Sequence, residues 1–187
     1  MTLQLREHGG DAFRIALGAF ASSVNVITMW NGEGEPLGMT ATAFSSVSVD
    51  PLLVLVCINR STRTYGHIAS SGRFGVNILS SVAREISDYC AAPGADKKLE
   101  SRWLNHEADW ACPALSGAHA FLDCEVDQNI EAGTHAVLIG AVRQVGLNKH
   151  ADELEPLVHY RGAYRQLQSA MEQTQPKPLP VVQEHPR

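Results

Sequence analysis

Within the segment from Gly38 to Asn59, hydroxyl side chains recur at intervals of two or four residues, at Thr40, Thr42, Ser46 and Ser48. Side chains separated by two or four residues on an extended chain share one face. That face can offer hydroxyls and backbone amides to a flat polar ligand, while the other face packs into a core. The same spacing is also typical of a Ser/Thr-rich strand on the surface of any β-protein.

A second polar group, Ser61, Arg63 and Thr64, comes directly after an apolar run and at the start of a predicted helix, residues 62–70. The beginning of a helix presents free amides, and a guanidinium presents paired donors, so the two together suit a phosphate. Arg63 alone is equally typical of a solvated surface arginine. Its position beside three hydroxyl residues favours the phosphate interpretation.

Other kinds of chemistry find little support. The four cysteines, Cys57, Cys90, Cys112 and Cys124, show no C-x-x-C spacing, and the eight histidines form no H-x-x-x-H pair. These patterns indicate neither a metal site nor a dithiol redox centre.

The net charge of −5 and the pI of about 5.9 argue against nucleic acid or an anionic membrane as the main partner. The sequence shows no signal-peptide pattern and no apolar run long enough to span a bilayer. A cytoplasmic protein is therefore predicted.

The elements that must position these residues are mostly strands. Strands are predicted, in chain order, over residues 24–29, 36–48, 52–59, 73–79, 118–131, 134–146, 157–160 and 163–167. Helices are predicted over 62–70, ending at Gly72, over 82–90, and after Asp11, which is expected to cap a helix carrying Phe13 and Phe20.

Many strands, few short helices and hairpin connections favour a closed antiparallel barrel, a mainly β fold with short flanking helices. No G-x-G-x-x-G follows a strand and opens a helix, so a Rossmann nucleotide site is absent from the pattern. The length of 187 residues suits one domain, predicted over 1–167. Residues 168–187, rich in Gln, Pro, Glu and Lys, are expected to form a flexible C-terminal tail.

Three segments together carry a resemblance: 38–59, Ser71-Gly72-Arg73-Phe74-Gly75-Val76-Asn77-Ile78-Leu79, and Tyr160-Arg161-Gly162-Ala163-Tyr164. In this order and spacing, the chain resembles the flavin reductase-like family from about Phe13 to Arg165. The resemblance implies an FMN-binding split β-barrel of antiparallel Greek-key type. It also implies an NAD(P)H-dependent flavin reductase that transfers hydride from NADH or NADPH to N5 of FMN (or FAD).

The resemblance also implies a site. The flavin ring is expected along residues 38–43, where a glycine and alanines would let it approach the main chain. The implied cofactor-binding residues are Gly38, Met39, Thr40, Thr42, Ala43, Cys57, Ile58, Asn59, Ser61, Arg63, Thr64, Tyr160 and Arg161. His135 is the implied catalytic residue, bordering the nicotinamide. Relatives have Gly-Asp-His at this place, whereas this chain has Thr134 before the histidine.

The implied partners are a second copy of the chain, forming a homodimer that covers part of the flavin, and a monooxygenase that accepts reduced flavin. The segment with Trp103 and Trp110 is a candidate for the dimer contact. Two alternatives stay open. One is a split-barrel enzyme with tightly held FMN that reduces a bound ferric chelate or corrinoid, and the other is a flavin-binding protein without turnover.

Overall fold

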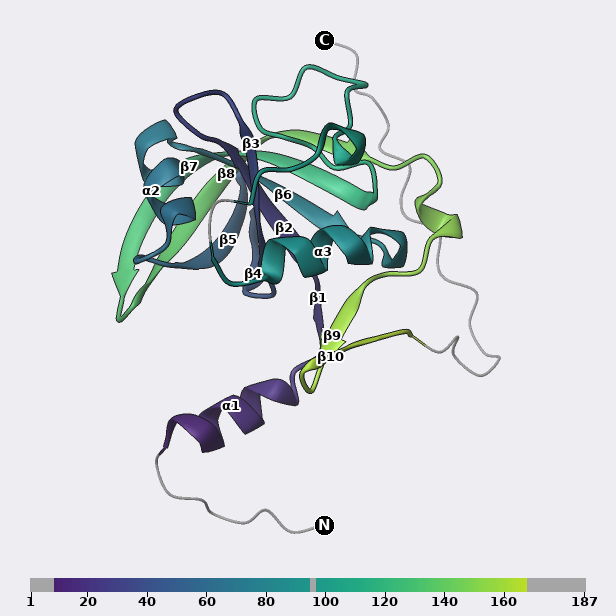
Figure 1. The fold of residues 1–187 in the computed structure, drawn as a ribbon. Helices are drawn as coiled ribbons and strands as arrows, with labels where there is room; N and C mark the ends of the chain where they lie inside the picture. The colour runs from purple at the N-terminus through teal and green to yellow at the C-terminus, as the bar shows by residue number, and fades with distance from the viewer. Residues whose placement is uncertain (1–8, 95–96, 168–187) are drawn as a thin grey trace.

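The computed structural model describes residues 9–94 and 97–167. Its main feature is one antiparallel seven-stranded sheet, curved into a barrel (Figure 1). The strands follow one another across the sheet in the order β3 (Pro36–Ala41), β2 (Asn25–Trp30), β6 (Arg73–Leu79), β7 (Ala118–Ala132), β8 (His135–Leu147), β5 (Leu52–Asn59) and β4 (Phe44–Val49). The mainly β fold predicted from the sequence is confirmed.

The two end strands of this sheet are neighbours in the sequence. β3 and β4 are joined only by Thr42 and Ala43, yet they do not pair with each other among the described residues. The sheet therefore curls until its two edges meet at this connection and stay split. The prediction of a single strand over residues 36–48 was wrong. At residues 42–43 the chain passes from one edge strand of the sheet, β3, to the opposite edge strand, β4.

Three α-helices lie outside the barrel in the described residues: α1 (Gly10–Gly18), α2 (Arg63–Ser71) and α3 (Arg84–Ala91). Short 3₁₀ turns, η1 (Ser81–Ala83), η2 (Ser101–Trp103) and η3 (Ala151–Glu153), complete the helical elements. Gly72 ends α2 at φ 68°, a left-handed conformation that glycine adopts without strain, and this confirms the predicted stop.

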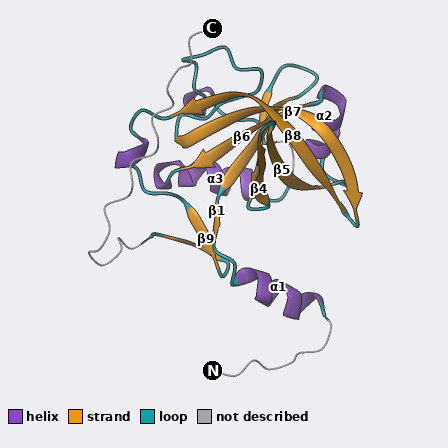
Figure 2. Ribbon diagram, turned by 180° about the vertical axis from the view of Figure 1, so that it is seen from behind, coloured by secondary structure: helices purple, strands orange, loops and turns teal. Residues whose placement is uncertain are grey.

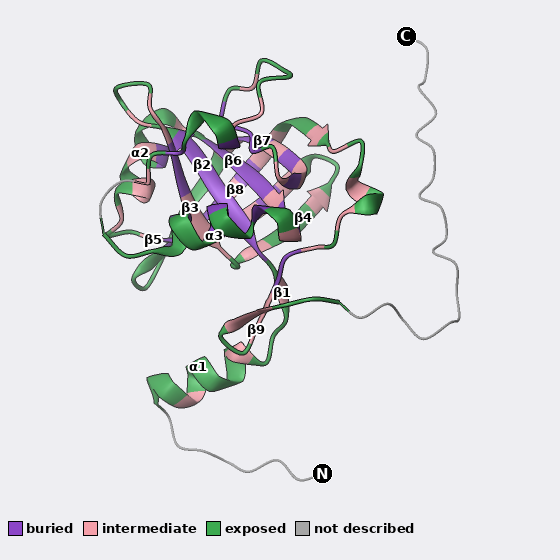
Figure 3. Cartoon of the chain, turned by 45° about the vertical axis from the view of Figure 1, so that its right-hand side comes forward, coloured by how far each residue is buried: buried purple, intermediate pink, exposed green. Residues whose placement is uncertain are grey.

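Strand β2 separates two apolar cores. Ile27 and Met29 face the barrel interior, whereas Val24 and Val26 face a second cluster beneath α3. Burial on both faces explains why five of the six β2 residues are buried (Figure 3). Trp103 belongs to the second cluster, so its side chain packs inside its own chain and is only 7% exposed.

A separate three-stranded sheet stands away from the barrel. It contains β1 (Ser22–Ser23), β9 (Val158–Tyr160) and β10 (Ala163–Arg165), and α1 continues from it (Figure 2). We call α1 and this small sheet the arm. The last two predicted strands, 157–160 and 163–167, are present but lie outside the barrel, because β9 pairs with β1 and β10.

The helix of the arm begins earlier than predicted. Gly9 is its N-cap, and Asp11 lies in the first turn, where its carboxylate accepts a hydrogen bond from Arg14. No helix in the described part of the chain is both long and apolar enough to cross a membrane. The predicted tail, 168–187, lies outside the described residues.

Candidate functional site

A cavity of about 470 Å³ opens between β3, the start of α2 and the end of α3. Its lining brings together the two polar groups that the sequence singled out. The residues are Leu37, Gly38, Met39, Thr40, Ser61, Thr62, Arg63, Thr64, Cys90, Ala91, Ala92, Pro93, Gly94 and Lys97. We call it the cationic cavity, because both of its charged lining residues in the described chain, Arg63 and Lys97, are positive.

The start of α2 is shaped by Asn59 at the end of β5. The Asn59 side-chain oxygen accepts hydrogen bonds from the Ser61 amide and hydroxyl, both at 2.9 Å. The Thr62 hydroxyl donates to the Asn59 carbonyl at 2.7 Å and accepts from the Tyr65 amide at 3.3 Å. These bonds hold the first turn of α2 at the cavity, where helix amides and the helix dipole favour an anion.

The wall at β3 depends on a short segment, residues 97–99, that lies along the outer edge of this strand. The Gly38 amide donates to the Lys97 carbonyl at 3.0 Å, and the Leu99 amide donates to the Pro36 carbonyl at 2.8 Å. A Cβ on Gly38 would lie 2.8 Å from the Cys90 sulfur. The structure therefore requires glycine here for packing of α3 and residues 97–99, a reason different from the close approach of a ring.

Thr40 is also tied to α3. Its hydroxyl donates to the Ser87 carbonyl at 2.7 Å, and the Ser87 hydroxyl is 2.8 Å from the Tyr164 hydroxyl in β10. The Thr40 side chain thus fixes the helix that forms the far wall of the cavity. Thr42 and Ala43 are exposed at the β3–β4 connection and do not line the cavity.

The electrostatics of the cavity suit an anionic ligand. No carboxylate is found among its described lining residues, although the whole chain carries a net charge of −5. Burial raises the pKa of the Cys90 thiol to about 12, and the nearby Lys97 ammonium opposes this shift. Cys90 is therefore a neutral packing residue near pH 7. Two cations beside a helix N-terminus form a donor set that suits a phosphate.

The end of β5 contributes mainly support. The Ile58 side chain is fully buried in the barrel core, so only its main chain is left for a ligand. The Cys57 amide donates to the Ala43 carbonyl at 3.1 Å and so holds the β3–β4 connection.

His135 lies at the same end of the sheet as the start of α2. It is the ladder partner of Asn59, is exposed, and does not line the cavity. The Thr134 hydroxyl is 2.9 Å from His135 Nδ1, so the threonine orients the imidazole.

Tyr160 and Arg161 are not brought to this cavity within one chain. They form the turn between β9 and β10 in the arm, where the Arg161 guanidinium lies 5.2 Å from the centre of the Tyr160 ring. The Arg161 amide donates to the Gly18 carbonyl at 2.9 Å, which joins this turn to the end of α1.

Sequence reasoning missed the walls formed by residues 90–94 and 97. The available signal was the pair Lys97-Lys98 in an otherwise irregular segment, but nothing in that segment indicates which lysine faces inward. The edge pairing of residues 97–99 with β3 determines this, and it is a tertiary contact.

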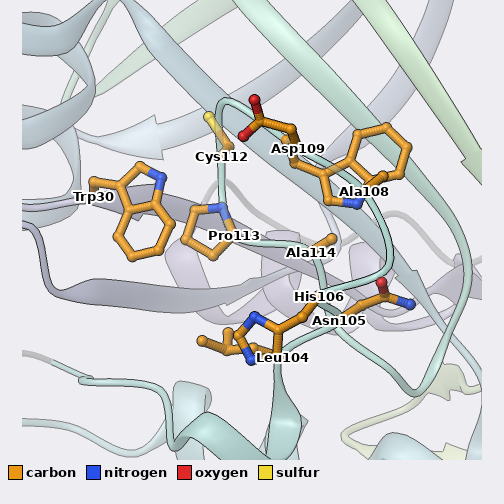
Figure 4. A pocket seen from close by; sticks show the side chains of 10 residues that line it. Trp30, Leu104, Asn105, His106, Ala108, Asp109, Cys112, Pro113 and Ala114 are labelled. Atoms are coloured by element: carbon orange, nitrogen blue, oxygen red, sulfur yellow. The ribbon is translucent and has the colours of Figure 1, made fainter.

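Two further cavities flank residues 104–114. The smaller one, about 200 Å³, is shown in Figure 4 and includes Trp30, His106, Asp109 and Pro113 in its lining. The other, about 570 Å³, lies beside the start of β7 and the end of β8. Neither lining includes the start of an α-helix or more than one Lys or Arg side chain. Within the described ranges, no three His, Cys, Asp or Glu side chains gather as a metal site would require.

Comparisons with known proteins agree on one family. The family model described as "Flavin reductase like domain" matches residues 17–168. A "Probable flavin reductase" of Rhizobium meliloti (strain 1021) is 41% identical over 132 residues, which are 70% of this chain and 42% of that protein. The reductase component of a flavin-dependent trigonelline monooxygenase of Acinetobacter baylyi is 37% identical over 151 residues, 81% of this chain and 47% of that protein. The chain thus spans less than half the length of these two relatives.

A solved structure extends the comparison to the fold. The NADH:FAD oxidoreductase SgcE6 of Streptomyces globisporus C-1027, in complex with NAD and FAD fragments, superposes with a TM-score of 0.78 at 25% identity. The match covers 91% of this chain and all of that one.

Proposed function

The chain belongs to the flavin reductase like domain family, and from this premise we propose that it is an NAD(P)H-dependent flavin reductase. The proposed flavin is FMN or FAD, and reduced flavin passes to a monooxygenase or another acceptor. The observation that carries the proposal is the cationic cavity, which combines the start of α2, two cations and an accessible stretch of β3. The relatives support it, since one is a monooxygenase reductase component and a similar structure holds NAD and FAD fragments.

The flavin, when bound, supplies the redox chemistry by accepting at N5 the hydride that leaves C4 of the nicotinamide. The chain's own residues then have three tasks. Arg63 and the first turn of α2 hold the phosphate, residues 38–40 of β3 support the ring, and α3 covers it. No side chain needs to act as a general acid or base, because the cofactors carry the chemistry.

We assign the positioning of the nicotinamide to His135. It lies across the β5–β8 ladder from Asn59, the residue that shapes the start of α2, and its ring is oriented by Thr134. Rings must be aligned closely for hydride transfer, and an exposed, oriented imidazole at this end of the sheet can contact the donor.

The test is steady-state oxidation of NADH and NADPH by the purified chain, with FMN, FAD and riboflavin varied in turn. We expect saturable, flavin-dependent oxidation by at least one donor. A chain that binds flavin yet oxidises neither donor would contradict the reductase and favour a binding protein without turnover. Yellow colour that survives gel filtration would favour tightly held FMN that serves a bound substrate.

The proposal includes a homodimer, argued from the arm. Helix α1 has no buried residue, and its side chains Phe13, Ile15 and Leu17 are 65%, 73% and 56% exposed, as is Phe20 just after the helix at 72%. A nine-residue helix is only marginally stable alone in water, so its apolar side chains need a covering surface. The barrel of a second copy offers one, since Val47 and Val49 of β4 are also exposed.

Such a dimer gives the Tyr160–Arg161 turn a role. The turn is joined to α1 by the bond from Arg161 to Gly18, so an arm that packs on a second copy carries the turn with it. We therefore assign Tyr160 and Arg161 to the cavity of the partner copy.

Sedimentation at micromolar concentration tests the assembly. The wild-type chain is expected to sediment as a dimer, and the double variant Phe13→Ser/Phe20→Ser as a monomer with weakened flavin binding. Arg14→Ser, on the same helix but at a polar position, is the matched control and should stay dimeric. A wild-type monomer with full reductase activity would rule out a shared site.

A further inference from the structure

Two adjacent lysines have different surroundings at the edge of β3. The Lys98 ammonium is 2.6 Å from a Glu35 carboxylate oxygen, and the main-chain carbonyl of Lys98 accepts a hydrogen bond from the Tyr89 hydroxyl. Lys97 instead lines the cationic cavity. Because neighbouring residues on an extended chain point to opposite sides, the pairing of Lys98 with Leu37 directs Lys97 toward the face of β3 that carries Gly38.

The backbone at Lys97 is fixed on both sides. Its carbonyl accepts from the Gly38 amide at 3.0 Å, and two residues later Leu99 is 2% exposed in the core beneath α3. The backbone of Lys97 is therefore held by a main-chain hydrogen bond to Gly38 and by the buried side chain of Leu99. Neither contact involves the Lys97 ammonium. A substitution at Lys97 can remove the charge and leave this wall in place.

Among residues 9–94 and 97–167, Lys98 forms an ion pair with Glu35, whereas Lys97 forms none. Lys97 and Cys90 line the same cavity, and the Lys97 ammonium lowers the pKa of the Cys90 thiol against the larger raising effect of burial. The Arg63 guanidinium carries one positive charge, and the N-terminus of α2 is equivalent to roughly half a charge. A phosphate monoester carries about −1.5 to −2 near pH 7, so these two alone leave part of its charge uncompensated.

We propose that Lys97 is a second phosphate-binding residue of this cavity and that it makes the site selective for phosphorylated flavins over neutral riboflavin. The proposal rests on the proposed function in one respect, that the ligand is a flavin. Lys97 and Arg63 come from different elements, so the phosphate is held from the α2 side and from the β3 edge at once.

Equilibrium binding of oxidised FMN and riboflavin, followed by flavin fluorescence at low salt, tests the role of Lys97 without turnover. Lys97→Ala is expected to raise the Kd for FMN about 5- to 20-fold, less than for a fully buried charged hydrogen bond because the ammonium is partly exposed. The Kd for riboflavin should change less than about 2-fold. Lys97→Arg, which keeps the charge, should recover most of the FMN affinity.

Lys98→Ala is the matched control, since it removes a neighbouring cation that is already paired with Glu35, and it should leave the preference for FMN intact. Added salt should weaken FMN binding more steeply in the wild type than in Lys97→Ala, because one ionic contact is lost. The Tm of each variant is measured by thermal melting to confirm that it folds. If Lys97→Ala does not fold, Lys97→Gln is used in its place.

Equal weakening of FMN and riboflavin, an unchanged FMN affinity, or a wild type without preference for FMN would each overturn the role of Lys97. The proposed function fails differently. A wild type that binds FMN with this selectivity yet oxidises no NAD(P)H would refute the reductase and leave Lys97 as a phosphate-binding residue.

Discussion

Gly38→Ala is the sharpest test of how the cavity wall is built. A methyl group at this position would lie 2.8 Å from the Cys90 sulfur, 3.0 Å from Leu99 Cδ2 and 3.1 Å from Val26 Cγ1. All three neighbours are at most 4% exposed, so none can move aside into solvent. Overpacking of this kind typically costs about 1–3 kcal/mol of unfolding free energy. For a chain of this size, that corresponds to a fall in Tm of roughly 2–12 °C.

The same change should impair binding. The structure can relieve the contact by moving Cys90 and Leu99 away from β3, and these residues belong to α3 and to the segment 97–99, which both form walls of the cavity. We therefore expect Gly38→Ala to lower flavin affinity as well as Tm. Differential scanning calorimetry and a flavin titration of the same preparation measure the two effects.

Gly66→Ala is the control, because Gly66 lies inside α2 with no atom within 4 Å of an added Cβ. It should raise stability by up to about 1 kcal/mol, since alanine is the better helix former. The double variant Gly38→Ala/Cys90→Ala removes the sulfur that makes the shortest contact and should recover part of the loss. A Gly38→Ala chain with wild-type Tm and flavin affinity would refute the packing role assigned to this glycine.

Two further predictions concern the ligands. Arg63→Ala should raise the Kd for FMN roughly 10- to 150-fold, as for a lost charge-assisted hydrogen bond, and should spare riboflavin; equal effects on both would remove Arg63 from the phosphate site. His135→Ala should raise the KM for NAD(P)H or slow flavin reduction in anaerobic stopped-flow, by on the order of 100-fold if alignment shifts by ~1 Å, with FMN affinity nearly unchanged. Unchanged flavin reduction would leave His135 with a structural role only.

The strands and their ends were largely predictable from local sequence. Asn31-Gly32 and Gly133 mark turns, and the runs 52–59 and 73–79 were predicted with the bounds that the structure shows. The division at Thr42 and Ala43 was not predictable in the same way. The sequence there continues its alternation without glycine or proline, and the break results from the sheet closing on itself.

The candidate site was predictable where its residues are close in the sequence. Residues 38–40 and 61–64 do meet in one cavity, because the edge of β3 and the start of α2 lie side by side. Which strand β9 joins, and which lysine of the pair at 97–98 faces inward, depend on pairing between distant segments. Strand periodicity indicates that a segment is extended, but it does not indicate the partner.

The contact between residues 97–99 and β3 also affects solubility. β3 is an end strand of the seven-stranded sheet, and an uncovered end strand presents amides and carbonyls that can pair with another chain. The bonds from Gly38 to Lys97 and from Leu99 to Pro36 occupy part of that edge. A change that detaches this segment therefore exposes a template for intermolecular β-pairing, and aggregation would accompany the loss of the ligand site.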